Sequence, residues 1–184
     1  MKEVDVMVDL ETLGTSAGCV VLSIGAIAFY PKEQQLGRTF YHVINQLSCA
    51  EVGLFADSDT VDWWNKQSLD AREVFYQAQD PNTSLRLGDV LTRFETFIKN
   101  VEADVRIWGN GADFDLPILG KAYLLSNREI PWKPWNGRCY RTLKNLSPET
   151  EAPEREGVHH HALDDAKFQA RHALALFRDL GLAT

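Results

Sequence analysis

A short strand pattern that ends in two carboxylates is the most constraining feature of the sequence. Residues 4–11 alternate Val and Leu with Asp, Met and Glu, which predicts a β-strand with one buried face. Asp9 and Glu11 are two residues apart, so their side chains project from the same face. Two carboxylates this close raise each other's pKa, and a hard cation such as Mg²⁺ or Mn²⁺ removes the conflict. Asp-x-Glu alone also fits a solvated strand end, so the rest of the chain has to decide.

The order of hydrophobic patterns predicts an α/β fold with a mixed sheet. Continuous apolar residues at 20–30 indicate a central strand buried on both faces, and 38–44 completes an antiparallel meander. Helical spacing follows in three segments, at 61–67, 69–77 and 87–98. The last third is expected to hold a strand, a helix, a short strand or helix, a mobile loop and a final helix, at 105–109, 115–125, 138–146, 147–157 and 161–180.

Charge and cysteine content narrow the class of protein. The 184 residues carry a formal net charge of −7, which disfavours tight non-specific nucleic-acid binding but suits an enzyme whose carboxylates hold metal ions. Three widely spaced cysteines without a CxxC pair indicate reduced thiols. The N-terminal residues lack the regions of a signal peptide, and no apolar run is long enough for a membrane span. We expect a single cytoplasmic domain over residues 1–184, without membrane association.

A second carboxylate motif follows the fourth expected strand. In Asn-Gly-Ala-Asp-Phe-Asp, the last carboxylate, Asp115, precedes a helix whose Pro117 fits only its first turn. Asp115 is thereby placed at or beside the N-cap, and capping is the alternative to a role in a site. If the first and fourth strands are neighbours, Asp115 meets Asp9 and Glu11 at one edge of the sheet, where α/β sites usually form.

The third motif combines a histidine with a carboxylate five residues later. On one continuous helix, His160 and Asp165 would point roughly 140° apart and would not share a face. We expect His160 on the loop before the last helix and Asp165 in its first two turns, so that both face one site. His159 and His161 flank His160 and leave a register shift of one residue open, and histidine runs also occur as metal-binding tracts.

Together these motifs resemble those of the DnaQ-like 3′→5′ exonucleases. The chain shows Asp-x-Glu-Thr, Asn-Gly-Ala-Asp-Phe-Asp and His-His-Ala-Leu-Asp-Asp-Ala in that order, which is similar to the DEDDh branch with its last motif His-x-x-x-x-Asp. Leu-Gly-Thr-Ser near Thr12 and Val-Asp-Trp-Trp-Asn-Lys-Gln-Ser near Trp63 resemble the bacterial and phage RNase AS-like exoribonucleases. The resemblance implies a ribonuclease-H-like fold, a five-stranded mixed sheet flanked by helices.

The same resemblance separates each candidate from a neighbouring competitor. Aligning Phe-Asp of the second motif with the family's Phe-Asp selects Asp115 over Asp113, which we expect to be solvated or outside direct contact with the metals. The five-residue offset from His160 selects Asp165 over Asp164.

The activity implied is phosphodiester hydrolysis with two Mg²⁺ ions, for which Mn²⁺ is expected to substitute. By the family pattern, Asp9 bridges both ions. Glu11 and Asp165 hold the first ion, and Asp115 supports the second. His160 takes the proton from the attacking water, a role that suits an imidazole because its pKa lies near neutrality.

Residues for substrate contact follow from the resemblance and from helix geometry. In this family the backbone just after the first motif meets the 3′-terminal nucleotide, which makes Leu10, Thr12 and Leu13 candidates. Trp63 and Trp64 point about 100° apart on a helix, so one can pack in the core while the other stacks a base. Packing of both is the alternative. The resemblance also suggests a homodimer interface in this region.

Two classes of function remain. The first is a metal-dependent exonuclease acting on single-stranded 3′ ends of RNA or DNA, with an exoribonuclease slightly favoured. The second is a catalytically silent nucleic-acid-binding module on the same fold, which would show a broken motif, whereas all five positions are filled here. Arg138, Arg141 and Lys144 are the best basic cluster for phosphates, with a solvated helix face as the alternative.

Overall fold

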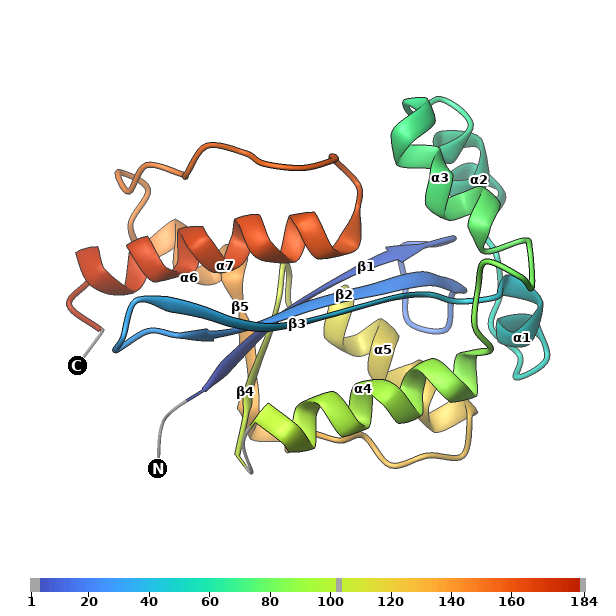
Figure 1. Ribbon diagram of the computed structural model, residues 1–184, viewed down its shortest axis with the longest axis horizontal. Helices are drawn as coiled ribbons and strands as arrows, with labels where there is room; N and C mark the ends of the chain where they lie inside the picture. The colour runs from blue at the N-terminus through green and yellow to red at the C-terminus, as the bar shows by residue number, and fades with distance from the viewer. Residues whose placement is uncertain (1–3, 102–103, 183–184) are drawn as a thin grey trace.

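A mixed five-stranded β-sheet with helices on both faces forms the protein in the computed structural model (Figure 1). The structure describes residues 4–101 and 104–182; residues 1–3, part of the stretch judged to lack a signal peptide, lie outside these ranges. The strands are β1 (Asp5–Thr12), β2 (Val21–Tyr30), β3 (Gln35–Val43), β4 (Arg106–Gly109) and β5 (Gly137–Cys139). The helices are α1 (Gln46–Ala50), α2 (Ser58–Trp64), α3 (Leu69–Gln77), α4 (Leu87–Val101), α5 (Asp115–Leu125), the 3₁₀ helix η1 (Pro134–Asn136), α6 (Tyr140–Leu146) and α7 (Ala162–Asp179).

The strand order β3-β2-β1-β4-β5 places β1 in the middle of the sheet. β1, β2 and β3 form the antiparallel meander expected from the sequence, and β4 and β5 run parallel to β1. Because β1 and β4 are parallel neighbours, their carboxyl ends lie side by side. This confirms the α/β fold with a five-stranded mixed sheet, and it brings the first two carboxylate motifs to one sheet edge.

β1 is buried on both faces, so the prediction of one buried face is wrong. Both alternating sets of its side chains are covered because helices pack on each side of the central strand. The polar member Asp5 is fully buried and accepts hydrogen bonds from Arg106 Nε at 2.9 Å and Trp108 Nε1 at 2.6 Å. These partners on β4 satisfy a charge that would otherwise be costly inside the protein.

α7 lies against one face of the sheet, and α4 and α5 cover the other (Figure 1). The face of α7 toward the sheet is made of small side chains, with Ala162, Ala166, Ala170 and Ala173 at 0% exposure. These small side chains let the helix approach β2 closely. A Cβ atom on Gly25 of β2 would lie only 2.2 Å from the backbone of Ala162, so the first turn of α7 rests directly on the strand.

Several element boundaries differ from the expected ones. α2 occupies 58–64 instead of 61–67, because the side chain of Asp57 caps it, accepting from Asp59 N at 2.8 Å. The segment 138–146 contains a strand end followed by a helix, β5 and α6. The connection between α6 and α7 is the expected loop, and it runs along α7 (Figure 1). Within the described ranges, no helix is both long and apolar enough to cross a membrane.

Candidate active site

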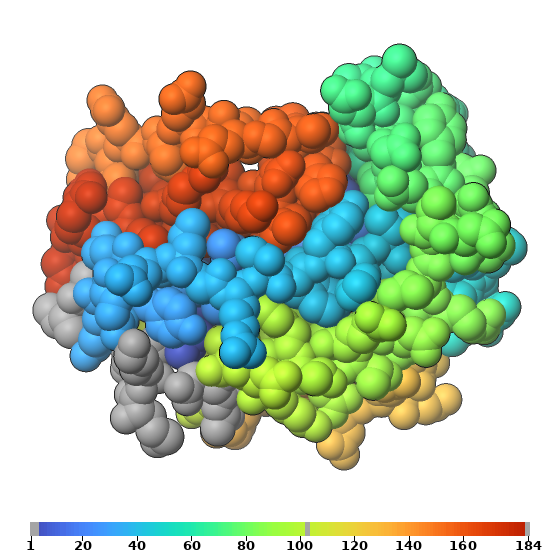
Figure 2. Space-filling view, viewed as in Figure 1, coloured from blue at the N-terminus to red at the C-terminus, as the bar shows by residue number. Residues whose placement is uncertain are grey.

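A cleft of about 960 Å³ lies where β1 and β4 end. α2 and α6 contribute to its walls together with the first turns of α7 and the loop before that helix. In the space-filling view, the green α2–α3 lobe stands beside the orange segment that precedes α7 (Figure 2). The lining includes all five residues singled out for chemistry, Asp9, Glu11, Asp115, His160 and Asp165.

Asp115 is held by backbone donors from two elements and leaves its own helix uncapped. Its Oδ1 accepts from the N–H of Leu10 at 3.1 Å, and its Oδ2 accepts from the N–H of Asn110 at 2.8 Å. The N-cap position of α5 is Phe114, which makes no side-chain cap hydrogen bond. Burial raises the pKa of Asp115 to about 6, although the two N–H donors oppose the shift. Asp115 therefore fastens the end of β4 to β1 and presents a buried carboxylate to the cleft.

The surroundings of Asp9 and Glu11 oppose ionisation of both carboxyl groups. Burial, and then the charges of Asp115 and Glu11, raise the pKa of Asp9 well above its usual range. Burial and Asp115 raise the pKa of Glu11 to about 8. Glu11 is only 6% exposed, and its Oε1 has no hydrogen-bond partner. Three carboxylates thus lie together at one end of the sheet, with too few hydrogen-bond donors and positive charges around them to balance three negative charges.

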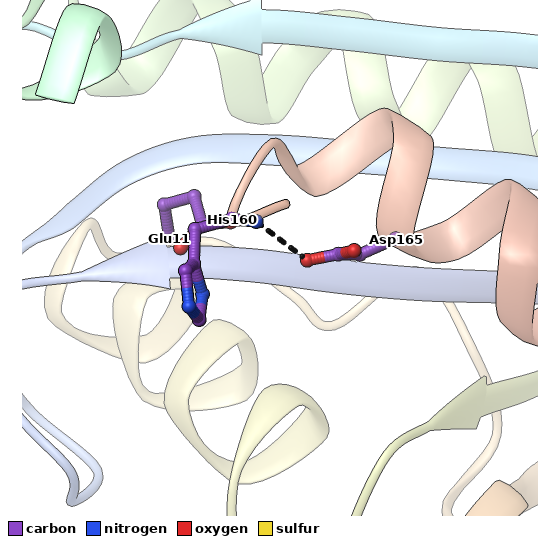
Figure 3. Close-up of side chains that lie close together, drawn as sticks. All are labelled: Glu11, His160 and Asp165. Carbon is purple, nitrogen blue, oxygen red and sulfur yellow. Dashed lines mark hydrogen bonds between the residues drawn. The ribbon is translucent and has the colours of Figure 1, made fainter. Parts of the chain in front are cut away.

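His160 and Asp165 come together as the sequence predicted, the histidine on the loop and the carboxylate in the first turn of α7. The backbone of His160 has φ of 63°, and its N–H donates to Asp165 Oδ2 at 3.2 Å (Figure 3). Ligand atoms of Glu11, His160 and Asp165 all lie within 4.8 Å of one another. Burial, followed by the nearby charges of His159 and Arg155, lowers the pKa of His160, which keeps the imidazole neutral near neutral pH.

The competing residues differ from the five candidates in exposure or in their partners. Asp113 lines the cleft but is exposed, as expected. Asp164 accepts from the N–H of Val158 at 3.0 Å and so holds the loop before α7. His172 is buried at 3% exposure and lies 2.7 Å from the hydroxyl of Tyr140, which makes it a packed residue outside the site.

Two polar residues in the cleft were missed by sequence reasoning. Gln169 of α7 donates through Nε2 to Asp9 Oδ1 at 2.7 Å. It follows Asp165 by four residues on the helix, a spacing that places both on one face and could have revealed it. Arg155 pairs with Asp165 Oδ1 and lies over the ring of Phe168 at 5.0 Å. Arg155 belongs to an irregular loop, so no sequence period pointed to it.

The residues expected to contact substrate are placed unequally. Both tryptophans line the cleft, but Trp63 is 40% exposed, whereas Trp64 is 1% exposed and donates through Nε1 to the carbonyl of Thr12 at 2.9 Å. One ring is thus packed in the core and the other is exposed, as one of the two expectations had it, and stacking of a base by Trp64 is corrected because its ring is enclosed. Leu10 and Thr12 line the cleft with buried side chains, while Leu13 lies outside the lining and both of its backbone groups bond within the chain.

The donor set fits divalent metal ions. Four carboxylates supply only oxygen donors, the preference of hard ions such as Mg²⁺ and Mn²⁺. The unpartnered Oε1 of Glu11 is free to ligate, and neighbouring carboxylates help to raise the pKa of both Asp9 and Glu11, a repulsion that a cation would relieve. The site therefore has both the donors and the electrostatic demand for bound metal.

Known structures share this fold. The nuclease domain of 3′hExo, described as a DEDDh family member bound to rAMP, superposes with a TM-score of 0.66 at 14% identity, covering 97% of this chain and 93% of that chain. E. coli Exonuclease I in complex with a 5cy-dT13 oligonucleotide gives 0.70 at 13% identity, covering 100% of this chain and 42% of that one. At such identities the likeness establishes the fold, which is the ribonuclease-H-like fold expected from the sequence.

The fold and the carboxylate–histidine cleft define the class of the DEDDh exonucleases. Residues 4–177 match the model of the 3′-5′ exoribonuclease Rv2179c-like domain, and the chain belongs to this family. An exodeoxyribonuclease of Enterobacteria phage T4 is 25% identical over 161 residues, covering 75% of this chain and 69% of the relative. The resemblance drawn from the motifs is thereby confirmed, and the protein is an exonuclease, a hydrolase of phosphodiester bonds.

Proposed function

We propose that the protein is a divalent-metal-dependent 3′→5′ exonuclease that shortens single-stranded 3′ ends, with RNA preferred over DNA. The observation that carries the proposal is the convergence of four carboxylates and one histidine in a single cleft, with Glu11 Oε1 left unpartnered. The family description as an exoribonuclease supports RNA, whereas the phage relative is described as an exodeoxyribonuclease.

The carboxylates divide the work of binding metal. In this proposal Glu11 and Asp165 would hold one Mg²⁺ ion, Asp115 would support a second, and Asp9 would contribute to holding both. Two such ions, when bound, supply an activated water and stabilisation of the leaving 3′-oxygen. Gln169 keeps Asp9 in place through its 2.7 Å hydrogen bond, which leaves the second oxygen of that carboxylate for ligation.

His160 is the proposed general base. The attacking water transfers its proton to the neutral imidazole while its oxygen bonds to phosphorus and the bond to the 3′-oxygen breaks. The lowered pKa of His160 keeps it able to accept that proton at neutral pH. Its ring packs edge-on against Trp63, with centroids 4.9 Å apart, which limits where the imidazole can point.

Substrate contacts are proposed for several residues that line the cleft. Trp63 offers an exposed ring for stacking the terminal base, and the backbone around Leu10 and Thr12 lies beside the carboxylates. Arg141, which donates to the carbonyl of Asn110 at 3.0 Å, and Lys144 also line the cleft and supply charge for phosphates. Arg138 lies outside the lining and donates to the carbonyl of Trp135 at 2.7 Å.

The decisive experiment is cleavage of 3′- and 5′-labelled single-stranded RNA and DNA of matched sequence with Mg²⁺, Mn²⁺ or EDTA. We expect a metal-dependent ladder that shortens from the 3′ end, faster on RNA, and lost in Asp9→Ala. Binding of oligonucleotide without cleavage, by a folded protein, would instead support the catalytically silent module. The homodimer, the cytoplasmic location and the single domain over residues 1–184 stay predictions, and sedimentation would test the first.

A further inference from the structure

Arg155 forms an ion pair with Asp165, one of the carboxylates that the proposed metal site needs. Its guanidinium pairs with Asp165 Oδ1, and the other oxygen of Asp165 accepts from the N–H of His160 at 3.2 Å. The Asp165 side chain is only 13% exposed, so both of its oxygens are engaged by protein groups. The negative charge of Asp165 is therefore balanced by the positive charge of Arg155.

A guanidinium and a divalent ion compete at this carboxylate. Two cations drawn to the same oxygen of Asp165 repel one another strongly where solvent is largely excluded. The backbone N–H of His160 holds Oδ2, so a metal ion held by Glu11 and Asp165 would have to compete with Arg155 for Oδ1. Metal loading therefore requires the Arg155 side chain to leave Asp165.

The Arg155 side chain can leave Asp165 while the backbone of its loop stays in place. The next residue, Glu156, pairs with Arg171 of α7 at 2.6 Å, and the Val158 N–H donates to Asp164. The guanidinium already lies over Phe168, which also lines the cleft, and Nε has no hydrogen-bond partner. Rotation about the side-chain bonds keeps the charge over this ring and turns its donors toward the cleft.

We propose that Arg155 exchanges partners, pairing with Asp165 before metal binds and with a substrate phosphate once metal is bound. The inference rests on the proposed function, because it requires a divalent ion at Asp165. A planar guanidinium suits the second partner as well as the first, since it binds carboxylate and phosphate through the same pair of donors. Arg155 is thus a substrate-binding residue that also sets the metal affinity of the site.

The test measures Mn²⁺ affinity by calorimetry without nucleic acid, followed by steady-state cleavage of a single-stranded RNA oligonucleotide at saturating Mn²⁺. For Arg155→Ala we expect Mn²⁺ binding roughly tenfold tighter, because a competing cation is removed. At saturating metal we expect KM to rise roughly tenfold, with kcat within about threefold of wild type. Arg155→Lys, which keeps charge but loses the paired donors, should shift both quantities in the same direction by less.

Arg171→Ala is the matched control, because it removes the ion pair with Glu156 in the same loop without touching Asp165. Its Mn²⁺ affinity should stay within about twofold of wild type. Unchanged or weaker Mn²⁺ binding by Arg155→Ala, or by Arg155→Lys if the alanine variant is unfolded, overturns the exchange. An unchanged KM overturns the phosphate contact. A wild-type protein that binds no Mn²⁺, or an Asp165→Asn variant that binds it equally well, overturns the metal site of the proposed function itself.

Discussion

Asp9 is a proposed metal ligand, and its buried carboxylate lowers the free energy of unfolding. Burial and two neighbouring carboxylates raise the pKa of its carboxyl group, and the hydrogen bond from Gln169 and the charge of Arg155 oppose that shift. Residues selected for binding metal are commonly strained in this way when the metal is absent, because the charge that ligation needs is unfavourable in a buried site. Stability and activity should therefore respond in opposite directions to removal of this charge.

Asp9→Asn removes the charge and keeps the shape of the side chain. In EDTA we expect the free energy of unfolding to increase by about 1–2 kcal/mol, because a repelled buried charge is lost. Cleavage should fall by at least about 10³-fold, because a ligand of both proposed metal ions is lost. Urea denaturation in EDTA and the cleavage assay measure the two effects. Asp113→Asn removes an exposed carboxylate of the same cleft and should change neither quantity by a comparable amount, and a destabilised Asp9→Asn would contradict the electrostatic account.

His160 and His159 form a natural pair for testing the general base. The rings lie 4.1 Å apart, yet only His160 donates its backbone N–H to Asp165 and is grouped with Glu11 as a potential ligand. His160→Ala should lower kcat by roughly 10²–10⁴-fold and retain Mn²⁺ binding, whereas His159→Ala should stay within about threefold of wild type. Equal losses of kcat in both variants would contradict the assignment of His160 as the general base.

At the scale of elements, the position of α7 decides whether the site exists. Its first turn carries Asp165, its second carries Gln169, and its start lies on Gly25 of β2. Gly25 is also the strand partner of Asp9 in the sheet register. The glycine therefore sets the distance between the two sides of the metal site, since any side chain there would push the helix outward.

Gly25→Ala tests this arrangement. The added Cβ meets backbone atoms of Ala162 and Leu163 at 2.2 Å, which cannot be relieved by a side-chain rotation. We expect a loss of about 1–3 kcal/mol in the free energy of unfolding and weaker Mn²⁺ binding, because Asp165 shifts away from Asp9. Thermal denaturation and calorimetry measure these effects. Gly88→Ala on α4 is the control, because its Cβ meets only Arg128 at 3.8 Å and should stabilise the helix by about 0.5–1 kcal/mol. A neutral Gly25→Ala would refute the close approach.

At the scale of the whole molecule, sheet topology gathers the charge. Parallel pairing of β1 with β4 brings Asp115 beside the Asp-x-Glu motif, and α7, which packs on β1 and β2, brings Asp165 close to Glu11. Because these carboxylates lie together in a poorly solvated part of the protein, the free energy of unfolding depends on pH and on metal ions.

The pH dependence has a definite sign. In the metal-free fold the pKa of Glu11 rises from 4.5 to about 8, and that of Asp115 from 3.8 to about 6. Between these limits the folded state binds more protons than the unfolded state, so these groups lower the free energy of unfolding as pH rises from about 4 to about 8. Saturating Mg²⁺ should flatten or reverse the trend, because metal binds the ionised carboxylates. Urea denaturation at pH 5, 6, 7 and 8, in EDTA and in Mg²⁺, measures it, and an identical pH dependence in the two would exclude this coupling.

Sequence patterns alone predicted the order of the main strands and helices, the α/β class and the candidates Asp9, Glu11, Asp115, His160 and Asp165, but they left the segment 138–146 open between strand and helix. These properties are written locally, since hydrophobic period, turn residues and short spacings depend on near neighbours in the chain. The family comparison confirmed the class and the fold that these motifs indicated.

Tertiary structure alone decided the remaining features. It enclosed both faces of β1, put Trp64 in the core and left Trp63 exposed, and brought Arg155 from an irregular loop onto Asp165. Burial of a central strand depends on which layers cover it, and a contact from a loop depends on how distant segments pack. Neither leaves a period in the sequence, because the physical interactions that produce them act between residues far apart along the chain.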